Sequence, residues 1–333
     1  MILTDLNYQM QAGKPMLIDP LKFKAFMDKV NLVLSNPDIA YHLSAYSDKY
    51  ENPNDFKSRR RRKHAGVWDD LDKEDLDDNL ASMLATPTTP YIEDGMGIIP
   101  VKGVIGKGLS KIESMLGCCD IKTISDTLDT WKKNDNVKEV VFKFDSGGGS
   151  TSGLEELARK IRNYPKRTIA YCEDDCGSAA YWLASQCAYF IVTPSSSVGA
   201  IGIFLVTKDA SEKHKEDGIK YVIIKSGEYK AAGVENTALS KLQFNRLQDE
   251  VEELHKRFKR DVKSVRLFVE DSDMEGQSFY GNDALVRNLV TNLVYEWSEA
   301  KDLIKGWREK TTISNITSMP IPSNFLNRLY PTE

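Results

Sequence analysis

Histidine is scarce in this sequence. The 333 residues include only four, His42, His64, His214 and His255. His42 and His64 lie in the first quarter of the chain, and the other two stand in highly charged stretches. A nucleophile activated by histidine and a carboxylate is therefore hard to build here. Any nucleophilic side chain of this protein needs another base.

The cysteines are also few, and their number is odd. The chain has five cysteines, at positions 118, 119, 172, 176 and 187. An odd, scattered set predicts reduced thiols rather than a disulfide framework. Cys172 and Cys176 have the spacing of half a zinc site, but no histidine lies near them in the sequence to complete tetrahedral coordination. We expect no metal and no cofactor.

The sequence has neither a long apolar run nor an excess of one charge. No stretch approaches the roughly 18 to 20 apolar residues that cross a bilayer, and the N-terminus lacks the basic and apolar regions of a secretory signal. The 45 basic and 49 acidic residues leave a formal net charge of −4, so no overall field attracts nucleic acid or an anionic membrane. We expect a cytoplasmic protein with no nucleic-acid partner and no membrane span.

Composition predicts four segments. Residues 1–57 are predicted to form a small helical appendage, in which a helix begins at Pro20. Residues 58–90 form a linker with a basic run at 58–64, an acidic run at 69–78 and a Pro/Thr cluster at 86–90. Self-cleavage near Arg59–Lys63 is a secondary hypothesis. Residues 91–297 form the main domain, and residues 298–333 a tail that we expect to be irregular from Thr311.

The main domain alternates strand and helix patterns. We predict strands at 98–105, 137–144, 168–171 and 189–192, and helices at 121–131, 154–164 and 178–187. This alternation predicts an α/β fold with βαβ units in a mostly parallel sheet. A long helix follows at 240–268, and its apolar stripe from Leu247 to Val265 packs against the body or another subunit.

The residues that carry chemistry are Ser178, Lys230 and a glycine run. A serine hydroxyl attacks only when a base takes its proton, and a lysine is such a base when burial keeps it neutral. The small residues around both side chains suit close, dry packing. Gly148 and Gly149 follow a strand, so their N–H groups, with that of Ala179, are candidates for an oxyanion hole. The alternatives are that Ser178 is a helix N-cap and Lys230 a surface lysine.

Seven stretches, taken in order along the chain, carry a resemblance to a known family. They are residues 99–105, 145–149, 177–184, 196–202, 225–230, 238–240 and 276–281. Together they resemble the signal peptide peptidase A family of Ser-Lys serine proteases, which implies a Clp/crotonase-type fold of repeated ββα units. The resemblance also implies that Ser178 attacks and Lys230 is the base. The chain departs from the family at Ala179, where glycine is frequent, and at Gly147, where proline is frequent.

The resemblance implies a role and an assembly as well. The opening Lys14–Pro20 is similar to the phage head maturation protease branch, so a polypeptide of the capsid or scaffold is the expected substrate, cleaved in the host cytoplasm or inside a procapsid. Such proteases form homo-oligomeric rings. Ser197 would orient Lys230, because a buried lysine needs a polar partner. Alternatives are a cytoplasmic signal-peptide-degrading peptidase, a non-catalytic ring-forming assembly protein, and an acyl-CoA hydratase or isomerase of the same fold.

Overall fold

The structure, a computed structural model, describes residues 16–18, 27–28, 89–110, 113–114, 116–207, 209–234 and 237–313. The chain divides into two units, Met1–Leu293 and Val294–Glu333. Most of the predicted appendage 1–57 and of the linker 58–90, including the basic run, lies outside the described residues.

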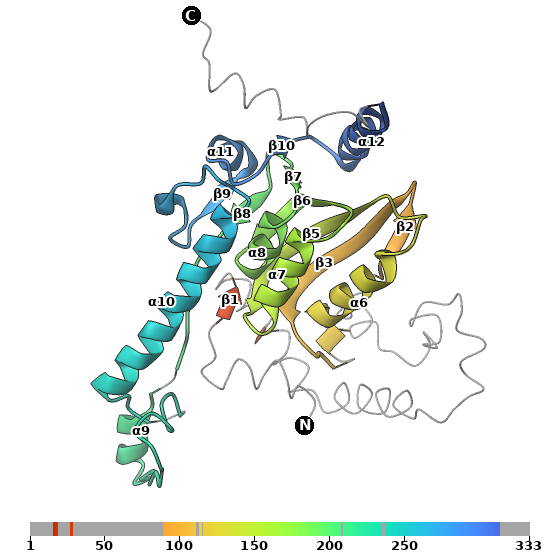
Figure 1. The fold of residues 1–333 in the computed structure, drawn as a ribbon. Helices are drawn as coiled ribbons and strands as arrows, with labels where there is room; N and C mark the ends of the chain where they lie inside the picture. The colour runs from red at the N-terminus through yellow and green to blue at the C-terminus, as the bar shows by residue number, and fades with distance from the viewer. Residues whose placement is uncertain are drawn as a thin grey trace, which may run out of the picture. The chain divides into compact units, whose positions relative to one another are not determined.

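A ten-stranded sheet forms the frame of the first unit (Figure 1). Its main path runs β10-β7-β6-β5-β3-β2, and the pairs along it are parallel except β2 with β3. The strands of this path are β2 (Tyr91–Glu93), β3 (Met96–Gly106), β5 (Glu139–Ser150), β6 (Arg167–Gly177), β7 (Tyr189–Val192) and β10 (Asn292–Leu293). Four short strands pair beside it: β1 (Met16–Ile18), β4 (Cys119–Asp120), β8 (Ser197–Gly199) and β9 (Ser278–Tyr280).

Three helices pack on this sheet in the order expected of βαβ units. They are α6 (Ile121–Trp131), α7 (Leu154–Arg162) and α8 (Ala179–Ser185), and they lie side by side in Figure 1. In α6 the Asp120 side chain caps the helix by accepting from the Lys122 N–H, and its buried residues repeat at helical spacing from Ile121 to Trp131. The short helices α9 (Ser211–Glu216), η2 (Asp271–Asp273) and α11 (Gly281–Val286) complete the unit.

The long helix α10 (Lys241–Lys263) packs on α8 through its C-terminal half. Phe258 is fully buried and stacks on Trp182 with ring centroids 4.5 Å apart. The Trp182 Nε1–H donates to Asp261 Oδ2 at 3.1 Å. This end of the apolar stripe is therefore part of the chain's own core, whereas Leu247 and Leu254 remain half-buried.

The predicted α/β class is confirmed, with one local correction. The helix at Ile121–Trp131 and the strand at Tyr189–Val192 have the predicted bounds. The glycine run, which the sequence suggests is a loop, belongs to β5 instead, because β3 pairs with it on one side as far as Gly149. In the second unit, α12 (Trp297–Ile313) continues past Thr311, where we expected irregular chain. No helix in the described ranges has the length and apolarity to cross a membrane.

Candidate active site

Ser178 occupies a tight turn between β6 and α8, with an unusual backbone conformation. Its φ is 54° and its ψ is −115°, a region that glycine favours and side chains rarely adopt. Its side chain makes no capping hydrogen bond to α8, so the interpretation of Ser178 as an ordinary N-cap is wrong. Such strain costs on the order of 1–3 kcal/mol and tends to occur at functional sites.

Backbone contacts hold Ser178 in this turn. Its N–H donates to the Gly199 carbonyl oxygen at 2.8 Å. Its Oγ lies 3.4 Å from the Gly202 carbonyl oxygen, a long hydrogen bond. Ser178 is only 2% exposed. The segment from Gly199 to Gly202 thus contacts Ser178 through two carbonyl oxygens. Sequence reasoning assigned this segment no role in the site, although it lies in one of the stretches that carry the family resemblance.

The glycine run lies near the Ser178 turn, since its Gly147 carbonyl oxygen would be 3.5 Å from a Cβ on the preceding residue, Gly177. Gly148 has φ of 111°, and a Cβ on Gly149 would lie 1.9 Å from the Ile105 carbonyl oxygen, so a side chain fits at neither position. The Gly148 N–H donates to Ser146 Oγ at 3.1 Å. Gly148 would have to share or release that bond to serve an oxyanion. Ala179 is the first residue of α8, where N–H groups lack an intrahelical partner.

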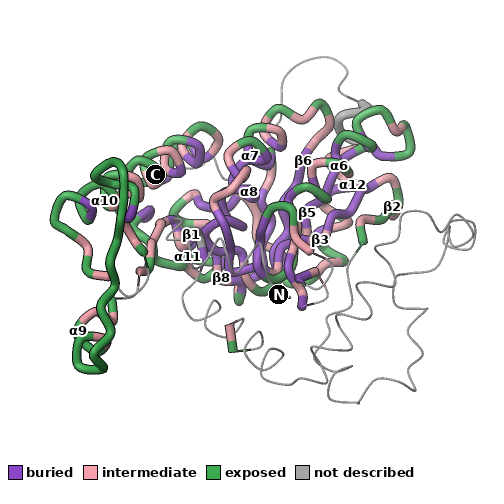
Figure 2. Tube along the Cα trace, turned by 90° about the horizontal axis from the view of Figure 1, so that it is seen from below, coloured by how far each residue is buried: buried purple, intermediate pink, exposed green. Residues whose placement is uncertain are grey.

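Lys230 lies away from Ser178, on a projecting part of the chain. We call residues 209–247 the arm, excluding residues 235 and 236, which are not described; it comprises α9, the segment after it and the first turns of α10. Figure 2 shows the arm as largely exposed, and Lys230 itself is exposed. The dry environment that we expected for Lys230 is not present within one chain.

Contacts along α10 set the separation between Lys230 and Ser178. The Glu228 carbonyl, two residues before Lys230, accepts from Gln243 Nε2 at 3.4 Å. Near the other end of the helix, His255 Nε2 lies 3.0 Å from the carbonyl oxygen of Ile201, which adjoins Gly202 in the segment that contacts Ser178. At about 1.5 Å per residue, Gln243 and His255 are roughly 18 Å apart along the helix. The structure therefore does not bring Ser178 and Lys230 together in one subunit.

Ser197 lies on β8, close in sequence to the segment that contacts Ser178. It is half-buried and is registered opposite Asp175 of β6 and Tyr280 of β9. Since Lys230 is on the arm, the structure does not pair Ser197 with it in the same chain. The orienting role of Ser197 stays a prediction.

The cysteines are poor candidates for chemistry. All five are free, and all but Cys119 are buried. Burial raises the pKa of the Cys119 and Cys187 thiols to about 12, and it raises the pKa of Cys172 further. Such thiols stay protonated and are weak nucleophiles. Among the described residues, no three His, Cys, Asp or Glu side chains cluster as metal ligands would.

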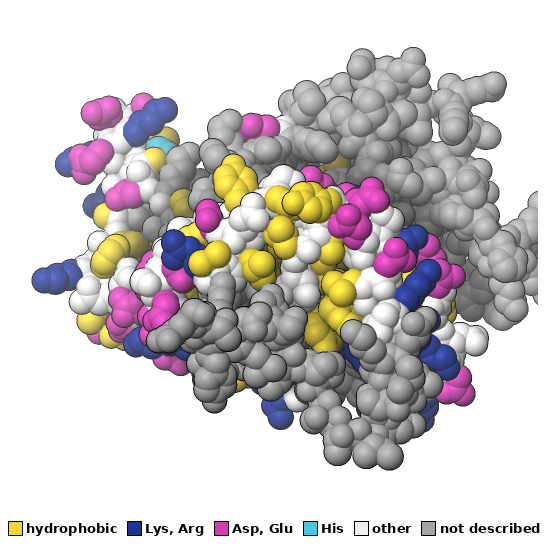
Figure 3. Space-filling model, turned by 90° about the horizontal axis from the view of Figure 1, so that it is seen from above, with side chains coloured by type: hydrophobic (Ala, Val, Ile, Leu, Met, Phe, Trp, Pro, Cys, Tyr) yellow, Lys and Arg dark blue, Asp and Glu magenta, His cyan; other side chains and the backbone are white. Residues whose placement is uncertain are grey.

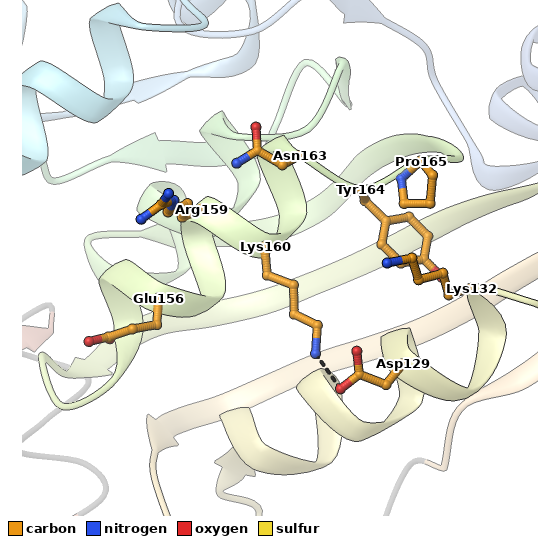
Figure 4. Close-up of a pocket in the computed structure, with 8 residues that line it drawn as sticks. All are labelled: Asp129, Lys132, Glu156, Arg159, Lys160, Asn163, Tyr164 and Pro165. Atoms are coloured by element: carbon orange, nitrogen blue, oxygen red, sulfur yellow. Dashed lines mark hydrogen bonds and ion pairs between the residues drawn. The ribbon is translucent and has the colours of Figure 1, made fainter.

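Two surface pockets lie around α7, and their charges are already paired. One, of about 300 Å³, is lined by residues of α6 and α7 and is shown in Figure 4. In it, Lys160 Nζ lies 2.6 Å from Asp129 Oδ2 and also donates to Ser125 Oγ at 2.8 Å. The other, of about 560 Å³, includes Arg260, which pairs with Glu155 at 3.0 Å. Neither pocket includes Ser178 or Lys230 in its lining.

Comparison with known proteins finds a family that is similar to this part of the chain. The sequence profile of Peptidase family S49 matches residues 160–308, a range that contains both Ser178 and Lys230. The glycine run at 147–149 lies upstream of the matched range.

Individual relatives of this chain are distant. A protein of Methanocaldococcus jannaschii named "Putative protease" is 27% identical over 59% of this chain and 63% of its own length. The head-tail preconnector protein GP5 of Enterobacteria phage P21 is 25% identical over 61% and 41%. A "Probable protease SohB" of Haemophilus influenzae is 26% identical over 58% and 54%. The chain thus spans about 41–63% of the length of these relatives.

Solved structures that are similar to this chain include enzymes of two kinds. A membrane-bound stomatin-specific protease covers 64% of this chain and 84% of its own, with 12% identity and a TM-score of 0.40. A member of the enoyl-CoA hydratase/isomerase family covers 66% and 76%, with 16% identity and a TM-score of 0.37. These scores are low, so the description of the fold rests on the strand order and helices given above.

Proposed function

We propose that this protein is a serine endopeptidase of the S49 family, with Ser178 as its nucleophile. The observation that carries the proposal is the backbone of Ser178, which is strained, makes no side-chain capping bond and is held by the Gly199 carbonyl oxygen. A strained turn from strand to helix presents a hydroxyl at a fixed position, as in other nucleophilic serine sites. A structural serine at a helix start would gain a capping bond instead.

The reaction would follow acyl transfer. Ser178 Oγ attacks the carbonyl carbon of the scissile bond while Lys230 Nζ takes its proton, and the N–H groups of Gly148, Gly149 and Ala179 stabilise the oxyanion. The intermediate collapses, the C–N bond breaks, and the lysine proton passes to the leaving amine. Water then attacks the acyl-enzyme while the same lysine takes its proton. The ester bond breaks, the proton passes to Ser178 Oγ, and the carboxylic acid product leaves.

We infer that the lysine comes from a neighbouring subunit. In its own chain Lys230 is exposed on the arm, and the α10 contacts next to it and next to the Ser178 turn are roughly 18 Å apart along the helix. A second copy that covered the arm would exclude water from Lys230, as its role as a base requires. The homo-oligomeric ring that we propose would then complete each site with one residue from each of two subunits.

The surface of the arm suits such an interface. Val222 is 73% exposed and Ile224 is 95% exposed. Residues 219–225 have the β-branched composition of a strand, yet the structure assigns no strand there. Figure 3 shows hydrophobic side chains reaching the surface of the arm, at the left of the view, among charged ones. Clustered exposed apolar side chains are typical of surfaces that another protein covers.

Substitution of the arm is expected to dissociate the oligomer. Val222→Asp together with Ile224→Asp should give a folded monomer with little peptidase activity, because both charges would be buried without partners in the interface. Light scattering and peptide cleavage measure the two effects. Ile92→Asp, at a 43% exposed position on the edge strand β2, is the matched control and should change neither. An assembled and fully active arm variant would refute the proposed interface.

We further propose a role for Ser197 and for the flanking segments. Ser197 would hydrogen-bond the incoming lysine of the neighbour, since a lysine buried in an interface needs a polar partner. Residues 91–297 would form the protease domain, with the appendage 1–57, the linker 58–90 and the tail 298–333 around it.

The proposed substrate is a capsid or scaffold polypeptide cut during phage head maturation, in the host cytoplasm or a procapsid. The name of the phage P21 relative, a head-tail preconnector protein, supports this choice. The SohB relative, a probable protease of Haemophilus influenzae, instead favours a bacterial peptidase. The family resemblance makes signal-peptide degradation the alternative role. Co-expression with candidate capsid and scaffold proteins, followed by mass spectrometry of new termini, distinguishes the two. A ring without catalysis is the remaining alternative.

Covalent labelling tests the nucleophile directly. A peptidyl phosphonate, which reacts with activated serines, should label the protein once per site, with the modified peptide containing Ser178. Ser178→Ala should remain unlabelled. Labelling elsewhere, or equal labelling of Ser178→Ala, would contradict the proposal.

A further inference from the structure

The peptide-binding edge beside Ser178 is already occupied by the chain itself. The last β5–β6 pair is Ser146 with Cys176, because β6 ends at Gly177 and the chain turns into α8. Strand β5 continues to Ser150, so the edge that β6 leaves is open to another strand. Strand β1 pairs along this edge, far from its place in the sequence.

Strand β1 is bonded on both sides. It runs antiparallel to β5, with Met16 opposite Ser150 and Ile18 opposite Gly148. On its other side the Met16 N–H donates to the Phe204 carbonyl oxygen at 2.8 Å, and the Phe204 N–H donates to the Met16 carbonyl oxygen at 3.1 Å. Met16 and Ile18 are each 4% exposed. The segment therefore lies between backbone groups of two neighbouring segments, which form the walls of a groove. The side chains of Met16 and Ile18, at alternate positions, are buried there.

Both walls of this groove lead toward the Ser178 turn. One contains the glycine run, whose Gly147 carbonyl oxygen would be 3.5 Å from a Cβ on Gly177. The other contains Gly202, whose carbonyl oxygen lies 3.4 Å from Ser178 Oγ. A peptide that adds to an open sheet edge uses main-chain hydrogen bonds for affinity and side-chain pockets for specificity. A substrate bound at this edge would need the same backbone groups that β1 uses. Strand β1 also runs toward Gly148, as the acyl part of a substrate would approach the oxyanion donors.

We propose that Met16–Ile18 is an internal occupant of the substrate groove and lowers the activity of the peptidase by competing with substrate until it is displaced. This proposal rests on the proposed function of Ser178. It also assigns a preference to the groove: substrates carry apolar side chains at two alternate positions before the scissile bond, as Met16 and Ile18 do. If β1 were only structural, substrate would bind at another place on the protein. Strand β1 would then not compete with it.

A reversible cross-link tests the occupancy in the full-length chain. Met16 and Phe204 exchange both hydrogen bonds, and such antiparallel pairs have Cα atoms about 5.5 Å apart, within the disulfide range. The variant is Met16→Cys with Phe204→Cys, and the matched control is Met16→Cys alone. Oxidation would lock β1 in the groove, and a thiol reductant would release it.

The readout is the rate at which a peptidyl phosphonate labels Ser178. We expect labelling of the oxidised double variant to be slower than in the reduced form by about tenfold or more, because a locked occupant lowers the fraction of open grooves. The single variant should show no such difference. Equal rates in the cross-linked and reduced double variant would overturn the proposal.

A second readout separates groove occupancy from chemistry. A fluorescent peptide with the sequence of residues 11–20 is titrated against the double variant that also carries Ser178→Ala. We expect binding to the reduced form and none to the cross-linked form. Equal binding to both forms would overturn the occupancy, whatever the labelling gives. Reduction-dependent binding without any labelling of Ser178 would keep the occupancy and reject Ser178 as the nucleophile.

Discussion

Ser178→Ala is expected to lower peptide cleavage by at least about a thousandfold, because catalysis is lost when the attacking atom is removed. The fold should stay intact, since the Ser178 side chain makes no capping bond and only one long hydrogen bond. Cleavage of a peptide with apolar residues at two alternate positions measures the loss, and circular dichroism checks the fold. Persistent cleavage in the purified variant would show that another residue attacks.

Ser178→Gly should be equally inactive but more stable than Ser178→Ala. Alanine keeps the strained backbone at φ 54°, whereas glycine adopts that conformation freely. The relief of strain outweighs the added entropy of the unfolded chain, so we expect about 1 kcal/mol more stability for the glycine variant. Denaturant unfolding of the two variants measures it. A glycine variant less stable than the alanine variant would mean that the turn is not strained.

Lys230→Met and Lys230→Arg are both expected to abolish cleavage. Methionine removes the base, and arginine keeps the positive charge but does not deprotonate in proteins. Both variants should still assemble. The matched control is Lys133→Met, an exposed lysine after α6 and outside the arm, which should keep wild-type activity. If Lys230→Arg cleaved at the wild-type rate, the base would have to be a different group.

The sequence predicted most of the main sheet, because its signals there are local. The helix Ile121–Trp131 repeats buried residues at helical spacing, and the strand Tyr189–Val192 is short and apolar. The glycine run was expected to be a loop, since glycine has low strand propensity. In the structure, pairing with β3 and β1 keeps it in β5. Strand β1 could not be predicted, because its partners are more than a hundred residues away.

The candidate site shows the same limit. Ser178 stands in a local motif, so its place between a strand and a helix was predictable. The position of Lys230 was not predictable, because it depends on the path of the arm and on how α10 then packs against the rest of the unit. Lys230 is exposed in a single subunit, whereas the active site that we propose is formed by two subunits. No pattern in a single sequence reports that difference.

The proposed site between subunits is tested most directly by combining two inactive variants. Ser178→Ala and Lys230→Met are co-expressed with different affinity tags, and mixed oligomers are isolated by purification on both tags. If Ser178 and Lys230 come from neighbouring subunits, random assembly should restore about a quarter of the sites, since each site pairs an intact serine with a neighbour's intact lysine. Each variant alone, tagged and purified in the same way, should be inactive. Mixed oligomers that assemble but cleave no peptide would place both residues of the site in one chain and contradict the account.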